Sequence, residues 1–149
     1  MNEPYSNQQA LDRLEELKED IKCADKRGVP PLTNGITQAE IISDAYHHPK
    51  YAGHGGVSDI AEYLDVSKAK VSIALKIVRD MIPELKEWMR DTDYQIHSLN
   101  KLASMSTLAQ WEALRSLKLL STSNVTEVLG VMDEKRDTSN IRVKEEMKR

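Results

Sequence analysis

The sequence predicts an all-α protein that contains several helices, and three observations support this. Apolar residues recur three and four positions apart in several segments, which is the repeat of one face of an α-helix. The alternation of apolar and polar residues that is typical of strands is almost absent. The 149 residues include no Phe and only 5% aromatic residues, so Leu, Ile, Val, Ala and Met have to build the core.

Composition restricts the compartment and the chemistry. The chain is 40% hydrophobic and 30% charged, and it has neither an apolar run of about 18 residues nor a signal-peptide pattern. We therefore expect a cytoplasmic protein without a membrane segment. Cys23 is the only cysteine, which excludes an internal disulfide and a cysteine metal cage. The net charge of −3 argues weakly against a nucleic-acid partner, but the positions of the basic residues matter more than their sum.

Four segments are expected along the chain. Residues 1–28 contain an amphipathic helix, residues 29–35 a linker rich in Pro and Gly, residues 36–132 a helical domain, and residues 133–149 a tail of mixed charge.

The apolar face of the first helix either lies on the domain or mediates dimerisation. It consists of Leu11, Leu14, Leu17 and Ile21.

Helix starts are expected from local patterns. The stretch TQAE from Thr37 to Glu40 is a capping box that would open one helix, and Thr107 with Gln110 forms a second. Pro83 suits the first turn of another helix. Asn124 is expected to cap a short helix before the tail.

The most informative stretch, VSDIAEYLDVSKAKVSIALKIVRD, covers residues 57–80 and predicts two short helices joined by a sharp turn. Asp65 lies in the turn, where a positive φ is often needed and Asp tolerates it better than most residues. Ser67 is a good N-cap for the second helix. Ala61 is small enough to let the two helices cross closely.

The second helix is expected to present one apolar and one basic face. Four basic residues and no acid lie between Ser67 and Arg79. Such a pair of helices has what a helix-turn-helix requires: the second helix enters the major groove, Lys and Arg neutralise phosphates, and Ser reaches a base edge or a phosphate. The predicted inward face is Val71, Ala74, Leu75 and Val78, and the outward face is Ala69, Ser72, Ile73 and Lys76, flanked by Lys68, Lys70 and Arg79.

Two alternatives stay open for this unit. Ile73 either touches a thymine methyl group or packs under the later helices. The whole unit is either a DNA-reading pair or an ordinary helical hairpin with solvated lysines.

From about Ile36 to Leu120 the chain resembles the central DNA-binding domain of the ParB/KorB family. The helix-turn-helix part of the resemblance depends on Ile60, Ala61, Leu64, Ser67, Val71 and Leu75. The helical region that follows it is matched at Pro83, Glu84, Leu85, Leu102 and Gln110.

The resemblance implies sequence-specific binding of double-stranded DNA, in transcriptional regulation or in plasmid or chromosome partition, in association with the nucleoid. Neither the Gly-Glu-Arg-Arg motif nor the CTP-binding domain of full-length ParB is found, so a compact DNA-binding protein without that enzyme is expected. A homodimer is expected, with a further protein partner possible through the first helix or the tail. The expected DNA-binding residues are Ser67, Lys68, Ala69, Lys70, Ser72, Ile73, Lys76 and Arg79.

Other function classes have less support. A helical adaptor that binds another protein is the main alternative, and exposure of Ile73 and Ile77 would favour it. We expect no enzyme and no cofactor, because no motif positions a nucleophile and Asp44, His47 and His48 lie beside a Pro/Gly loop. His47, His48 and His54 have no acidic or cysteine partner at ligand spacing, so we expect no metal site.

Overall fold

Seven α-helices and no strand make up the part of the chain that the computed structural model describes, which is residues 7–52, 55–119 and 129. The predicted all-α class is confirmed. The expected tail 133–149 and the helix start expected at Asn124 lie outside the described residues. The helices are α1 (Asn7–Arg27), α2 (Gly35–Tyr46), α3 (Gly56–Leu64), α4 (Lys68–Asp80), α5 (Pro83–Arg90), α6 (Ile96–Ser104) and α7 (Thr107–Leu119).

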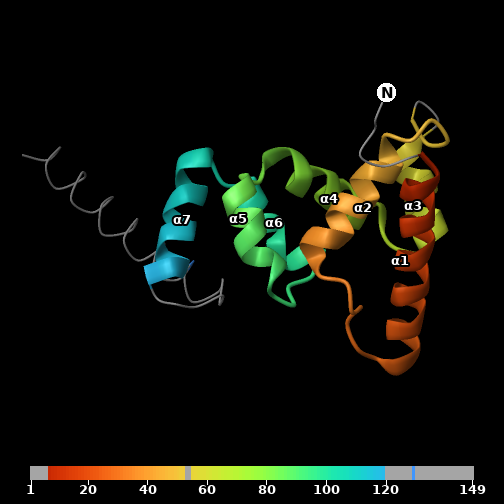
Figure 1. Cartoon of the computed structure of the whole chain (residues 1–149), viewed down its shortest axis with the longest axis horizontal. Coiled ribbons are helices and arrows are strands. Elements are labelled where there is room, and N and C mark those ends of the chain that lie inside the picture. Colours follow the sequence, from red (N-terminus) through yellow and green to blue (C-terminus); the bar gives the residue numbers. More distant parts are fainter. Residues whose placement is uncertain (1–6, 53–54, 120–128, 130–149) are drawn as a thin grey trace, which may run out of the picture.

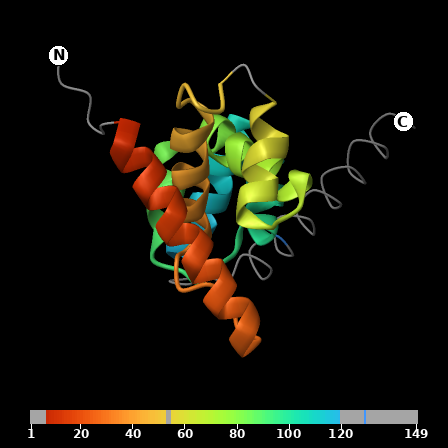
Figure 2. The ribbon, with the colours of Figure 1, turned by 90° about the vertical axis from the view of Figure 1, so that its right-hand side faces the viewer.

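Helices α2 and α4 lie at the centre of the arrangement. Helix α4 packs against α2, α3 and α6, and α1 lies across α2 and α3 (Figure 2). Helices α5 and α7 pack against each other, and α7 lies at the end of the described part opposite α1 and α3 (Figure 1). None of the helices in the described ranges is both long enough and apolar enough to cross a membrane.

The apolar face of α1 belongs to the same core as the later helices. Leu14, Leu17 and Ile21 are at most 5% exposed and join the cluster that contains Ile42 of α2. On the polar side, the Lys18 ammonium lies 4.4 Å from the ring centre of Tyr63 in α3. Of the two alternatives for this face, the structure therefore has it lying on the domain.

Two helix starts follow the sequence prediction and two do not. Pro83 occupies the first turn of α5, and the Ser67 hydroxyl accepts a hydrogen bond from a backbone amide of α4, both as predicted. The two capping boxes are wrong. Helix α2 is capped by Asn34, whose side chain accepts from the Ile36 amide at 2.7 Å, and the Ser106 hydroxyl accepts from the Ala109 amide at 3.1 Å.

A long-range contact explains why Asn34 is the cap. Its amide nitrogen donates to the carbonyl oxygens of Met89 in α5 and of Thr92 just after α5. The neighbouring Gly35 amide donates to the Tyr94 carbonyl oxygen at 2.8 Å, and a Cβ atom on Gly35 would lie 2.5 Å from that oxygen. The start of α2 therefore docks against the loop after α5, at a point where only glycine fits.

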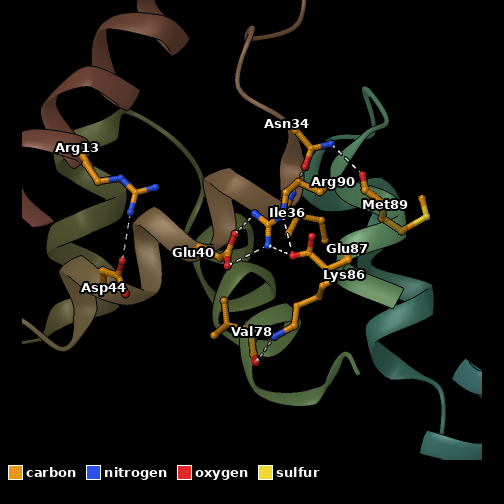
Figure 3. Close-up of polar contacts among 10 residues, drawn as sticks. All are labelled: Arg13, Asn34, Ile36, Glu40, Asp44, Val78, Lys86, Glu87, Met89 and Arg90. Atoms are coloured by element: carbon orange, nitrogen blue, oxygen red, sulfur yellow. Dashed lines mark hydrogen bonds and ion pairs between the residues drawn. The ribbon is translucent and has the colours of Figure 1, made fainter. Parts of the chain in front are cut away.

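Arg90 links α5 to α2 through ion pairs (Figure 3). Its guanidinium contacts Glu40 of α2 and lies 2.9 Å from the Glu87 carboxylate, and hydrogen bonding to Glu40 raises the pKa of Arg90. A second pair joins Arg13 of α1 to Asp44 of α2 at 3.6 Å. The groups in both pairs are about one-third exposed, so each pair contributes at most about 1 kcal/mol.

Candidate nucleic-acid interface

The turn between α3 and α4 has the conformation expected from Asp65. This residue adopts φ 57° and ψ 50°, and it is the one non-glycine residue with positive φ in the described part of the chain. The Asp65 amide donates to the Glu62 carbonyl and the Val66 amide to the Ala61 carbonyl, at 3.2 and 3.0 Å. These bonds end α3 and redirect the chain within three residues.

The two helices then meet through small and aliphatic side chains. Ile60, Ala61 and Leu64 of α3 are at most 3% exposed. At the start of α4 the Ser67 hydroxyl accepts from the Lys70 amide at 3.1 Å. A compact turn and a capped second helix therefore fix the direction in which α4 leaves α3.

The inward face of α4 differs from the prediction. Val71 and Ala74 are fully buried as expected, but the third buried position is Ile77, which is also 0% exposed. Leu75 and Val78 are only partly buried. The reason is that α4 is covered by α2 and by α6, so its buried face is set by both neighbours and is rotated from the face that the sequence suggested.

Four expected DNA-binding residues at the start of α4, Ser67, Lys68, Ala69 and Ser72, are exposed, and so is Arg79 near its end. At 100° per residue, Lys68, Ser72 and Arg79 fall within an arc of about 40°. Ala69 is also exposed, lies about 60° beyond the Ser72 side of this arc and presents only a methyl group. We call Lys68, Ala69, Ser72 and Arg79 the outer stripe of α4.

Lys70 does not belong to the outer stripe. It points about 160° away from Lys68 around the helix axis and is partly buried. Burial lowers the pKa of its ammonium group, and the nearby carboxylate of Asp25 in α1 opposes that shift. Lys70 therefore lies on the side of α4 that faces the end of α1.

Lys76 faces α6, and Ile73 is not fully exposed. The Lys76 ammonium donates to the Ser104 hydroxyl and lies 3.4 Å from the Asn100 side-chain oxygen, while Ser104 donates to the Asn100 carbonyl at 2.8 Å. Ile73 is partly buried against the core. Asn100 and Ser104 were not identified from the sequence, where only their spacing of four residues on one helix was visible.

Arg79 is exposed but has an acidic neighbour. Its side chain is 72% exposed and forms two hydrogen bonds to the Asp80 carboxylate, at 2.9 and 3.0 Å. These bonds raise the pKa of Arg79 and lower that of Asp80. One terminal nitrogen of the guanidinium is not used in this pair and faces away from Asp80. The positive charge at this end of the stripe is therefore partly offset.

A shallow polar groove of about 390 Å³ continues from the end of α4 to the α6–α7 junction. Its charged lining comes from α4, and its hydroxyl groups come from the end of α6 and the start of α7. These residues are Lys76, Arg79 and Asp80, and Ser104, Ser106 and Thr107. Helix α3, in contrast, exposes Asp59 and Glu62, so the basic side chains of this helix pair lie on α4.

The histidines make local hydrogen bonds. His47 Nδ1 lies 2.8 Å from the Ser43 carbonyl oxygen, and His48 Nδ1 accepts from the Lys50 amide at 2.9 Å. His54 lies outside the described residues. No group of three or more histidine, cysteine or acidic residues that could hold a metal ion occurs within ranges 7–52 and 55–119.

Comparisons with protein-family models, with curated proteins and with solved structures returned no match for this chain.

Proposed function

We propose that the protein binds double-stranded DNA sequence-specifically as a homodimer, with α3 and α4 acting as a helix-turn-helix, in transcriptional regulation or in plasmid or chromosome partition. The observation that carries this proposal is the outer stripe of α4, an exposed cationic surface that directly follows a left-handed turn at Asp65 and an N-cap at Ser67. A helix presented in this way can enter the major groove while the preceding helix crosses above it.

Each residue of the stripe has a distinct task in the proposal. Lys68 is exposed at the first turn of α4 and neutralises a phosphate. Ala69 allows close approach, and the Ser72 hydroxyl reaches a base edge or a phosphate. Arg79 contacts the backbone further along through the guanidinium nitrogen that Asp80 leaves free. Lys70, Ile73 and Lys76 support the helix from its flanks and add positive charge or packing.

The salt dependence of DNA binding tests the phosphate contact of Lys68. Affinity for a mixed-sequence duplex is measured by fluorescence anisotropy over a series of salt concentrations. Each lost phosphate contact reduces the slope of log K against log salt by about 0.9 for duplex DNA. We expect Lys68→Ala to lower the slope by about one unit and to weaken binding to all sequences.

The matched control is Lys22→Ala, which removes another exposed lysine, from α1. It should leave the slope within about 0.3 of that of the unmodified protein. An identical slope for Lys68→Ala and the unmodified protein would remove Lys68 from the interface. An absence of salt-dependent binding in the unmodified protein would contradict the proposed function itself.

The adaptor alternative loses its main support. Exposure of Ile73 and Ile77 on α4 would have favoured it, but Ile77 is 0% exposed and Ile73 is partly buried against the core. Helix α4 therefore offers no apolar groove residues at these positions for a partner helix.

A further inference from the structure

Helix α7 has one buried face and, opposite it, one exposed face. The buried face packs into the core and consists of Gln110, Ala113, Leu114 and Leu117, all at most 2% exposed. The opposite face exposes three large apolar side chains, Leu108 at 70%, Trp111 at 44% and Leu119 at 73%. Among the described residues only Val29 and Leu32 are other exposed large hydrophobic residues, and both lie between α1 and α2. Exposed large hydrophobic side chains are therefore few on the described surface, and three of the five lie on the outer face of α7.

The outer face carries a regular stripe. Leu108, Glu112, Arg115 and Leu119 are spaced by four, three and four residues and fall within an arc of about 60°. This is the spacing of residues along the seam of two packed helices. Both charged residues are exposed, and neither forms an ion pair within the described ranges. We call these four residues the α7 stripe.

The α7 stripe has the same spacing when it is read from either end of the helix, with leucines at both ends and opposite charges at the two inner positions. About its midpoint, between residues 113 and 114, Leu108 is related to Leu119 and Glu112 to Arg115. If two copies of α7 meet antiparallel around a two-fold axis, each leucine meets a leucine and each glutamate meets an arginine. In a parallel pair, by contrast, Glu112 and Arg115 would each face the same charge.

We infer that the α7 stripe is a self-association surface, which binds the α7 stripe of a second copy of this chain in an antiparallel arrangement. Charge complementarity and the repeated leucines identify the second copy as the occupant, because an isologous interface must be complementary to itself. Trp111 flanks the stripe and adds apolar contact area, as aromatic residues commonly do at interfaces.

The inference deepens the proposed function, because it rests on the homodimer proposed there and assigns its interface. Helix α7 lies at the end of the molecule opposite α1 and α3 (Figure 1), whereas α4 begins beside α3. Pairing through α7 therefore leaves Lys68 and Ser72 uncovered in both copies. With only 13 residues in α7, the contact is short, and we expect a dissociation constant in the micromolar range.

Charge reversal tests the arrangement without DNA. Sedimentation is measured from micromolar to near-millimolar protein for the unmodified chain, Glu112→Arg, Arg115→Glu and the double variant. Each single change places like charges at both symmetry-related contacts, so we expect the dissociation constant to rise roughly tenfold or more. The double variant restores opposite charges and should dimerise like the unmodified chain.

Mixing the two single variants gives a sharper readout. A chain with Glu112→Arg and a chain with Arg115→Glu are complementary to each other, so the mixture should form dimers that neither forms alone. Glu16→Arg on the exposed surface of α1 is the matched charge control and should not change association.

Register is tested by cross-linking in a Cys23→Ser background, because Cys23 is an exposed free thiol. A disulfide needs Cα atoms closer than about 7 Å. A mixture of Leu108→Cys and Leu119→Cys chains should therefore cross-link, whereas either variant alone should cross-link far less.

Two results would overturn the inference: an unmodified chain that stays monomeric over the whole range, and dimers that persist equally in both single variants. The first would mean that the α7 stripe does not bind a second copy, and the second that the copies meet elsewhere. The first result would also contradict the proposed homodimer, whereas the second would not. Neither result concerns the salt-dependent DNA binding of α4, which is measured separately, so failure of the inference is distinguishable from failure of the proposed DNA binding.

Discussion

Replacing Gln110 with Met should destabilise the protein more than any other single polar substitution in α7. The Gln110 side chain is 1% exposed and makes three hydrogen bonds. Its oxygen accepts from the Ile82 amide at 2.7 Å, and its nitrogen donates to the Asp80 and Met105 carbonyl oxygens at 2.8 and 3.1 Å. It therefore joins α7 to the α4–α5 junction and to the end of α6.

The magnitude follows from these bonds. Each contributes about 1 kcal/mol net, and a buried donor left without an acceptor costs about 1–3 kcal/mol. Methionine keeps the volume and adds some apolar burial, so we expect Gln110→Met to lower the free energy of unfolding by about 2–4 kcal/mol. With a urea m-value of roughly 1.5 kcal/mol/M, the midpoint should fall by about 1.3–2.7 M.

The assay is urea unfolding followed by circular dichroism at the helix band. Gln8→Met is the matched control, because Gln8 is exposed on α1 and bonds only to Asp12 one turn away. That variant should stay within about 0.5 kcal/mol of the unmodified protein. A loss of less than about 1 kcal/mol for Gln110→Met, at an unchanged m-value, would refute the role assigned to its three hydrogen bonds.

Three further predictions concern the backbone and one carboxylate. Asp65→Gly should stabilise the protein by about 0.5–1 kcal/mol in thermal melts, because glycine adopts the left-handed conformation freely. Asp65→Val should destabilise it by about 1–2 kcal/mol. Equal melting temperatures for the two variants would contradict the left-handed conformation of the turn. Gly35→Ala should lower the free energy of unfolding by about 1–3 kcal/mol, because its Cβ would meet the Tyr94 carbonyl. The control Gly28→Asn, at an open left-handed position, should lower it by less than about 1 kcal/mol. A similar loss of stability in both variants would count against the docking of α2. Burial alone would raise the pKa of Asp20, but hydrogen bonds from Thr33 and Leu32 bring the pKa below its usual 3.8. The ionised carboxylate therefore stabilises the fold above pH 3.8, and this stabilisation is lost as the pH falls through the folded pKa. The difference in stability between the unmodified protein and Asp20→Asn should therefore be largest near neutral pH and shrink below about pH 4; a difference that is constant down to pH 2 would show that ionisation of Asp20 is not involved.

Local sequence rules predicted the elements that depend on neighbours along the chain. The positive φ of Asp65, the cap at Ser67 and the early position of Pro83 in α5 each depend on the conformational preference of one residue, and the structure has all three. The apolar repeat likewise placed Leu14 and Leu17 correctly in the core.

The prediction of helix caps from the sequence failed where several suitable cap residues lie close together in the chain. Thr37 and Asn34 are both suitable cap residues, and the choice depends on Met89 and Thr92, more than 50 residues further along the chain. A long-range contact of this kind is not visible in a local pattern. At α7, likewise, Gln110 turns inward to the α4–α5 junction and does not close a capping box.

For the same reason, the sequence predicted only part of the candidate site. Lys68 and Ser72 lie on the exposed side of α4 as expected, because their positions follow from the helical repeat alone. Lys70 and Lys76 leave the exposed side, since Lys70 is partly buried near Asp25 of α1 and Lys76 lies against Asn100 of α6. The repeat gives the angle between residues on one helix, but it does not give the directions from which other helices cover it.

Selection of bound duplexes from a random pool, at near-physiological salt, is the most direct test of the proposed DNA recognition by α4. The unmodified protein and the Lys68→Ala/Ser72→Ala variant are compared, with Lys22→Ala as the control. We expect the unmodified protein and the control to enrich one two-fold symmetric sequence, and the double variant to lose that enrichment. If the unmodified protein enriches no sequence, or if the double variant enriches the same sequence equally well, the outer stripe of α4 does not read DNA.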